Sequence, residues 1–136
     1  MSDTDDMDRE GVPTRQLMTP DIVTVTPDTS IDEAVSILID NDIGSLVVVD
    51  DDNTLAGVIT SNDFLNVVAD GAHATDGSVE DFMTDQVVTI HPEDDIQTAA
   101  ARMITNSISH LPVEDDDGII GMLSTTDITA YSVSRA

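Results

Sequence analysis

MTPDIVTVTP, residues 18–27, returns later in the chain as MTDQVVTIHP, residues 83–92. Met-Thr, Val-Thr and Pro hold the same places in both stretches, and the match continues along the rest of each copy. The further matched pairs are Ile31/Ile96, Ala34/Ala99, Ile39/Ile104, Asn41/Asn106, Ile43/Ile108, Leu46/Leu111, Val48/Val113, Gly57/Gly121, Thr60/Ser124 and Asp63/Asp127. A match of this length indicates an internal repeat, and a repeat decides the architecture.

Each copy of the repeat begins with a strand and a helix. In the first copy the β-branched residues 22–25 predict a strand, and Pro27 with Asp28 predicts a turn. Ser30 and Glu33 have the spacing of a capping box, which marks the start of a helix. The apolar residues that follow have helical spacing; they are Ile31, Ala34, Val35, Leu38 and Ile39.

The rest of each copy predicts two more strands and a second helix. In the first copy, residues 46–49 and 55–59 are apolar strands around the acidic turn 50–53, and a helix follows from Asp63. The fold class is therefore α/β, with the order β-α-β-β-α occurring twice. We expect residues 1–11 to be a disordered acidic tail, 12–69 the first domain, 70–79 a linker and 80–136 the second domain.

The charge of the chain is strongly one-sided. Asp and Glu number 28, Lys and Arg number 4, and the formal net charge is −24. Without a cationic surface the chain cannot be a general nucleic-acid binder. Such a charge would repel itself in dilute salt and be screened in concentrated salt. The composition therefore favours a protein from a salt-loaded cytoplasm, as in a halophilic archaeon.

Several functional classes find no support in the residues. No apolar run approaches the length of a membrane span and no signal-peptide pattern is present, so we expect a cytoplasmic protein without a membrane partner. No Cys is present, and no two His have metal-ligand spacing. No nucleophile–base set is recognisable, so we expect neither an enzyme nor a metal site. The runs 50–52 and 115–117 have the composition of solvated turns more than of a magnesium site.

The doubled pattern resembles the CBS-domain family, whose domains occur in pairs called Bateman modules. The resemblance covers residues 12–133. It is carried by Met18-Thr19, Pro27, Ile31 to Ala34, Gly57 to Thr60 and Asp63, and by Met83-Thr84, Pro92, Ile96 to Ala99, His110 to Val113, Gly121 to Ser124 and Asp127. It implies a stand-alone pair of domains, packed sheet to sheet with pseudo-two-fold symmetry, that forms a homodimer and regulates an unknown protein.

The resemblance also implies a ligand, namely an adenosine-containing compound such as AMP, ADP, ATP or S-adenosylmethionine, held in the cleft between the two domains. The residues it assigns to binding are Ile22, Val23, Ser45, Leu46, Thr60, Asn62 and Asp63 in one copy, and Val87, Val88, His110, Leu111, Pro112, Ser124, Thr126 and Asp127 in the other.

The chemistry of those positions can be stated from the residues themselves. A strand ends at Thr60 and a helix begins, so unpaired backbone N–H groups there suit a phosphate. Asp63, one turn later, could accept hydrogen bonds from two ribose hydroxyls. The alternative is that Thr60 and Asp63 only cap the helix.

The chain departs from the family pattern beside these acids. Family members that hold phosphates often carry Arg or Lys there, but this chain has Ser61-Asn62 and Thr125-Thr126. The departure favours AMP or an S-adenosyl ligand over ATP. Two other functions stay open: a ligand-free scaffold for dimerisation or protein interaction, and an unrecognised enzyme.

Overall fold

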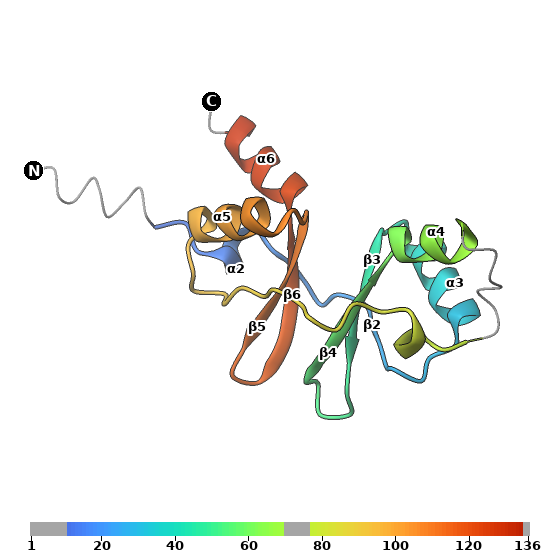
Figure 1. The fold of residues 1–136 in the computed structure, drawn as a ribbon. Coiled ribbons are helices and arrows are strands. Elements are labelled where there is room, and N and C mark those ends of the chain that lie inside the picture. Colours follow the sequence, from blue (N-terminus) through green and yellow to red (C-terminus); the bar gives the residue numbers. More distant parts are fainter. Residues whose placement is uncertain (1–10, 70–76, 135–136) are drawn as a thin grey trace, which may run out of the picture. The chain divides into compact units, whose positions relative to one another are not determined.

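The computed structural model of this chain describes residues 11–69 and 77–134 (Figure 1). The expected tail lies outside the described residues except for Gly11, and so does the expected linker except for residues 77–79. The elements, in chain order, are α2 (Thr14–Leu17), β1 (Thr19–Pro20), β2 (Thr24–Val25), α3 (Ile31–Asn41), β3 (Ser45–Val49), β4 (Leu55–Thr60), α4 (Ser61–Ala69), the 3-10 turn η2 (Val79–Asp81), α5 (Ile96–Asn106), β5 (His110–Asp115), β6 (Gly118–Ser124) and α6 (Thr125–Ser134). The fold class is mixed α/β, as predicted.

The chain folds into two compact units whose limits differ from those of the repeats. The first-repeat unit is Val23–Val87, and the second-repeat unit joins Val88 and the residues after it to the segment that ends at Ile22. The predicted boundaries followed the matched residues, whereas the compact units divide each copy just after its opening segment. How the two units pack, sheet to sheet or otherwise, stays a prediction.

The first-repeat unit contains a three-stranded sheet in the order β2-β3-β4. Strand β2 pairs in parallel with β3, and β3 pairs with β4 in antiparallel register, with Ser45 opposite Thr60 and Leu46 opposite Ile59. All five residues of β3 are buried, as expected for a central strand covered on both faces.

The second-repeat unit contains a sheet in the order β1-β6-β5. Strands β5 and β6 form an antiparallel hairpin, with His110 opposite Ser124 and Leu111 opposite Leu123. Strand β1 adds to the other edge of β6, with Thr19 opposite Met122.

The first predicted strand of the second copy is reduced to a single bridge. Ile90 bridges Val113 in parallel, donating its N–H to Pro112 O at 3.1 Å, but Val88 and Thr89 form no strand. Pro112 faces this segment and has no N–H to donate to it, so the ladder cannot extend. The matching residue in the first copy, Val47, pairs normally with Thr24.

Each unit has its own aliphatic core, built from one face of its sheet and its helices. The first-repeat core consists of Val25, Ile31, Ala34, Leu38, Leu46, Val48, Ile59 and Val79. The second-repeat core consists of Ile90, Ala99, Met103, Leu111, Val113 and Leu123.

The predicted helix start at Ser30 is confirmed, and the apolar stripe of each of these helices ends in an exposed residue. The Ser30 side chain accepts the N–H of Glu33 at 3.2 Å, and Asp95 accepts that of Thr98 at 2.8 Å. At the other end of the helical stripe, Ile39 is 71% exposed and Ile104 is 79% exposed. Within the described residues, no helix is long and apolar enough to span a membrane.

The opening segment of each repeat packs in the unit of the other repeat. We call residues 12–19 the N-strap and residues 77–84 the central strap. Thr14 and Arg15 of the N-strap donate their N–H groups to Asp94 O and Pro92 O at 2.8 and 3.0 Å. Val79 and Glu80 of the central strap make the matching bonds to Thr29 O and Pro27 O, also at 2.8 and 3.0 Å.

The central strap begins within the expected linker. Ile31 donates its N–H to Gly77 O at 3.2 Å, and Val79 is fully buried. Residues 77–79 therefore belong to the packed first-repeat unit, and only the part of the expected linker before them lies outside the described residues.

Candidate functional site

The first candidate site lies where β4 runs directly into α4. Asp63 accepts the backbone N–H of Thr60 through Oδ2 at 2.8 Å, and its own N–H is donated to Thr60 Oγ1 at 3.3 Å. This is a reciprocal cap: each side chain satisfies an N–H group that the helix start leaves without a partner. Thr60 and Asp63 therefore do cap the helix, as the structural alternative in the sequence analysis required.

The second repeat reproduces this geometry. Ser124 donates its N–H to Asp127 Oδ2 at 2.9 Å, and Asp127 donates its N–H to Ser124 Oγ at 3.1 Å. The next N–H after each cap also has the same partner: Ser61 donates to Gly44 O, and Thr125 donates to Ser109 O, both at 2.9 Å.

The caps leave part of each carboxylate available. In both repeats the hydrogen bonds use Oδ2, and among residues 11–69 and 77–134 no hydrogen bond reaches Oδ1 of Asp63 or Asp127. Both acids are half-buried, at the positive end of a helix dipole. Each could therefore accept a hydroxyl of a ligand without giving up its cap.

The sheet register brings several predicted residues to the same end of each sheet. In the first-repeat unit, Ser45 lies opposite Thr60 and is followed by Leu46, while Val23 directly precedes β2, the neighbour of β3. In the second-repeat unit, His110 lies opposite Ser124. The first residues of β3 and β5 and the capped helix starts therefore meet at one end of each sheet.

Three of the residues that the resemblance assigns to binding have no exposed side chain for a ligand to contact. Leu46 in β3 and Leu111 and Pro112 in β5 are fully buried, so their side chains belong to the interior of their units. A ligand could instead contact Val23, which is 38% exposed, and the exposed Asn62.

Some of the remaining predicted residues lie at accessible positions, and others belong to a different unit from the rest of their set. In the second repeat Thr126 is exposed, while Val88 and His110 are half-buried. His110 also shares a hydrogen bond between its Nδ1 and Ser109 Oγ at 3.1 Å. Ile22 and Val87 belong to the other unit from the rest of their sets, and their role stays a prediction.

The motif glycine has a structural reason that the sequence did not reveal. A Cβ on Gly57 would lie 2.7 Å from the backbone O of Thr84 and 2.8 Å from Met83 Sδ. A Cβ on Gly121 would lie 2.8 Å from both Thr19 O and Met18 Sδ. Glycine is therefore needed because a strap crosses each strand at close range. The sequence feature that corresponds to this contact is the repeated Met-Thr pair, because Met and Thr of each strap lie against the glycine.

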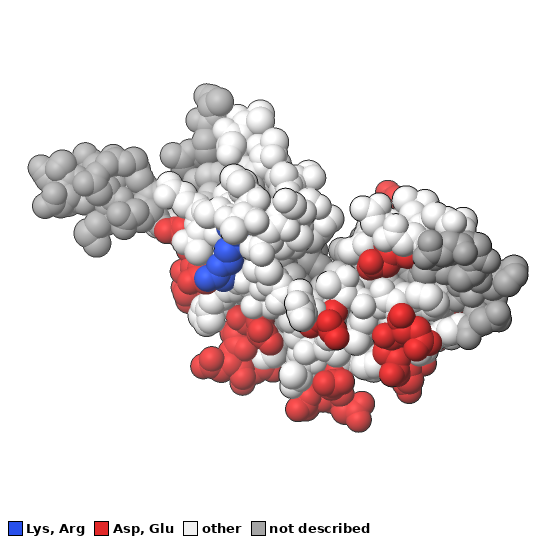
Figure 2. Space-filling model, viewed as in Figure 1, with Lys and Arg blue, Asp and Glu red and all other residues white. Residues whose placement is uncertain are grey.

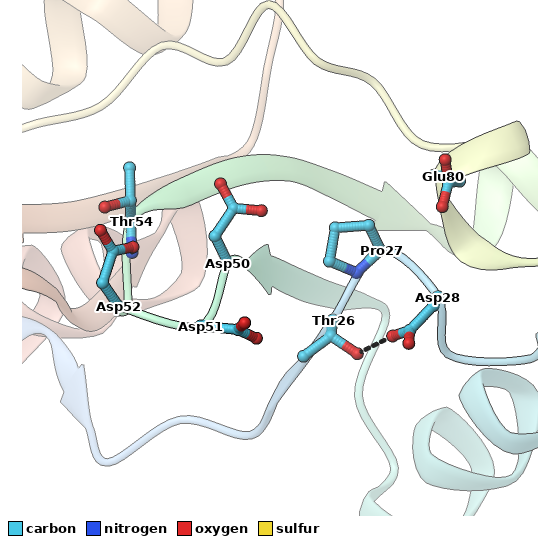
Figure 3. A pocket seen from close by; sticks show the side chains of 8 residues that line it. All are labelled: Thr26, Pro27, Asp28, Asp50, Asp51, Asp52, Thr54 and Glu80. Atoms are coloured by element: carbon cyan, nitrogen blue, oxygen red, sulfur yellow. Dashed lines mark hydrogen bonds between the residues drawn. The ribbon is translucent and has the colours of Figure 1, made fainter.

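An acidic pocket of about 590 Å³ opens elsewhere in the first-repeat unit (Figure 3). It is lined by Thr26, Pro27, Asp28, Asp50, Asp51, Asp52, Thr54 and Glu80. Hydrogen bonds from the side chain and then the backbone of Thr54 lower the pKa of Asp52. In the part of the chain that the structure describes, no three acidic or His residues are grouped as a metal site would require.

Comparison with known proteins decides the family. The sequence pattern of the CBS domain matches residues 15–70 and again residues 79–134. The chain belongs to the CBS domain family. The doubled match agrees with the internal repeat, and it confirms the tandem pair inferred from the sequence.

Curated relatives of this CBS pair include larger proteins, of which it matches only a part. It is 37% identical over 114 residues to a homoserine O-acetyltransferase of Methanohalobium evestigatum, covering 83% of this chain and 22% of that protein. It is 35% identical over 108 residues to the mitochondrial CBS domain-containing protein CBSX3 of Arabidopsis thaliana, covering 76% of this chain and 52% of that protein. The chain thus spans about a fifth of the acetyltransferase and half of CBSX3.

Solved structures of similar CBS pairs contain adenosyl compounds. CBSX2 in complex with AMP has a TM-score of 0.81 and 27% identity, covering 91% of this chain and 98% of that one. The CBS domain pair of MJ0100, in complex with 5'-methylthioadenosine and S-adenosyl-L-methionine, has a TM-score of 0.81 and 30% identity, covering 89% and 99%. These ligands are properties of those two proteins.

Proposed function

We propose that this CBS pair is a regulatory module that senses an adenosine-containing ligand, with AMP and S-adenosyl compounds favoured over ATP. The observation that carries the proposal is the twin capped acid: Asp63 and Asp127 have the same geometry at the same strand–helix junction, each with Oδ1 left unbonded by the described residues. The ligands of CBSX2 and MJ0100 support the adenosyl class.

The preference among adenosyl ligands rests on charge. Lys and Arg are absent from residues 23–87, so nothing in the first-repeat unit could neutralise a triphosphate. The helix start at Thr60 offers only the partial positive charge of its dipole, which suits a single phosphate better than three. A sulfonium compound is itself a cation, so the negative charge of the chain favours it. A panel of AMP, adenosine, S-adenosylmethionine and ATP, tested by calorimetry in high salt, would rank them.

Replacing either capped acid by Asn should weaken ligand binding with little effect on the free fold. In Asp63→Asn or Asp127→Asn the new amide keeps one oxygen for the cap but presents an NH₂ group where Oδ1 would accept a ribose hydroxyl. Losing a hydrogen bond to a charged acceptor should cost about 1.5–3 kcal/mol of binding. In 3 M KCl, ligand at about 100 times its Kd stabilises by about 2.7 kcal/mol, so thermal melts report the loss.

Two further variants make this test specific. Asp32→Asn removes the same charge from an exposed first turn of α3 and should leave the ligand shift unchanged. Asp63→Ala should lower the unfolding free energy by about 0.5–2 kcal/mol even without ligand, because the cap is lost. An unaltered shift for AMP, adenosine and S-adenosylmethionine in both Asn variants would leave Asp63 and Asp127 as caps only.

The rival function, an interaction scaffold, is favoured by the exposed apolar helix faces. Ile39, Leu65, Val68, Ile104 and Val133 are all more than 60% exposed. An apolar groove between α5 and α6 is lined by Ala100, Met103, Ile104, Ile108, Thr125, Ile128 and Thr129. Helix α5 carries no acid, and the acids of α4 and α6 are the two capping residues. In so acidic a chain, a face with so few acids can meet a second copy with less repulsion than the rest of the surface.

We therefore expect a homodimer through these helices. Light scattering in 3 M KCl should give about twice the 14.5 kDa chain mass. Ile104→Glu should shift the mass towards the monomer, whereas Thr98→Glu, which adds the same charge at the start of the same helix, should not. A monomer at micromolar concentration would contradict the expectation.

We further propose that the module is cytoplasmic, acts on a protein partner and binds neither nucleic acid nor membrane. The charge of −24 supports the last two points. We infer no catalytic role, and a turnover assay on the same adenosyl panel would expose one.

A further inference from the structure

The two straps dock on their units through matching backbone hydrogen bonds but carry opposite charge. The N-strap has Arg15 where the central strap has Glu80, and the backbone N–H of each donates to a proline carbonyl, Pro92 O or Pro27 O, at 3.0 Å. The residue after each proline is acidic, Glu93 or Asp28. One strap therefore faces its turn with opposite charge, and the other with like charge.

The N-strap is held by side chains as well as by its backbone. Arg15 Nε forms an ion pair with Glu93 Oε2 at 2.9 Å, and Thr14 Oγ1 donates to Asp94 O at 2.8 Å. Arg102 lies 3.9 Å from Asp94 in the same unit. The N-strap thus has electrostatic attraction to its turn in dilute salt.

The central strap has no such compensation. Glu80 lines the acidic pocket together with four aspartates from two turns of the same unit (Figure 3). No Lys or Arg occurs anywhere in residues 23–87. The strap is held by backbone hydrogen bonds, by the fully buried side chain of Val79 and by Phe82 and Met83, which pack against the core. None of these contacts brings a positive charge to offset the like charge.

Ionic strength acts on these two arrangements in opposite directions. At about 0.1 M salt the Debye length is about 10 Å, so the exposed carboxylates around the pocket repel one another, while above 1 M it is about 3 Å or less. Screening removes the repulsion at Glu80 and weakens the attraction at Arg15. On the face shown in Figure 2, acidic side chains gather near the hairpin ends, and the visible cations belong to the second-repeat unit.

We propose that the central strap, residues 77–84, is an ionic-strength-sensitive closure of the first-repeat unit. It stays packed in concentrated salt and detaches in dilute salt before the unit unfolds, whereas the N-strap stays packed in both. Detachment uncovers Val79 and the strand residues around Gly57. The proposal does not depend on ligand binding at Asp63 or Asp127.

Amide hydrogen exchange in the full chain tests the proposal. As KCl is lowered from 3 M at constant temperature, the amides of Val79 and Glu80 should lose protection first, roughly fivefold or more ahead of those of Thr14 and Arg15. The four amides have matched acceptors at matched distances, so each sample contains its own control. Simultaneous loss of all four with the buried strand β3, or earlier loss at Thr14 and Arg15, would overturn the proposal.

Charge-reversal variants test whether like charge is the cause of the early opening. Glu80→Arg should create the ion pair seen between Arg15 and Glu93 and abolish the early loss at Val79, while Asp28→Arg should do the same from the other side. Asp40→Arg makes an equal change of charge on the exposed end of α3 and should leave the early loss in place. If the central strap still opens first in both Glu80→Arg and Asp28→Arg, like charge is not the cause.

Discussion

In 3 M KCl this CBS pair should melt at least about 10 °C above its melting point in 0.1 M KCl. The net charge is −24, and the described residues contain two ion pairs, both on the second-repeat unit. Folding brings the carboxylates closer together, so the folded state suffers more repulsion than the unfolded chain and gains more from screening. Differential scanning fluorimetry with a dye, or circular dichroism, would give the midpoints, since the chain has no Trp.

The shape of the salt curve separates screening from general salting-out. The Debye length falls from about 10 Å at 0.1 M to about 3 Å at 1 M, so screening should produce most of its effect below 1 M. Strengthened hydrophobic burial continues to rise at higher salt. A midpoint that is flat up to 1 M would contradict the electrostatic explanation and, with it, the expectation of a halophilic source.

The repeat made most of the fold predictable from the sequence. The order of strands and helices in the first copy, the cap at Ser30 and the acidic turn after Val49 follow from local patterns, and the structure contains all of them. The interrupted strand before Pro92 could also have been predicted, because Pro112 in the neighbouring segment has no N–H to donate to the ladder.

The exchange of the straps could not be predicted, for a physical reason. The straps that contain Met18 and Met83 carry the same sequence pattern, so the periodicity is equally satisfied whether each strap packs in the unit of its own repeat or in the other unit. Only the three-dimensional structure shows in which unit each strap packs. The exchange explains why the compact units begin at Val23 and Val88 rather than at the starts of the repeats.

The candidate site was predicted in its residue types but not in its burial. Thr60 and Asp63 meet as the spacing required, and so do Ser124 and Asp127. Leu46, in contrast, is one of the residues that the resemblance assigns to binding, and it is fully buried. Apolar residues of a central strand read alike whether they line a site or fill the core, because periodicity does not report what covers each face.

The Gly, the Thr or Ser, and the Asp that the two repeats share therefore each have a structural role. Any role in ligand binding is additional to it. The Gly leaves room for a strap. The hydroxyl of the Thr or Ser accepts the N–H of the Asp in the first turn of the helix, and the Asp carboxylate accepts the N–H of that Thr or Ser. Because Gly57 has no side chain that could bind a ligand, replacing it tests the packing of the strap alone.

Gly57→Ala and Gly121→Ala should each lower the unfolding free energy by about 1–3 kcal/mol or more, as overpacked sites do. Met83 Sδ and Met18 Sδ can move aside, but the backbone O of Thr84 and of Thr19 lies under 3 Å from the new methyl group, so the strap itself must shift. Gly44→Ala is the matched control, because nothing lies within 4 Å of its added Cβ. Denaturant unfolding in 3 M KCl would compare the three variants. If Gly57→Ala and Gly121→Ala were as stable as Gly44→Ala, the close approach of the straps would not be what requires glycine at these positions.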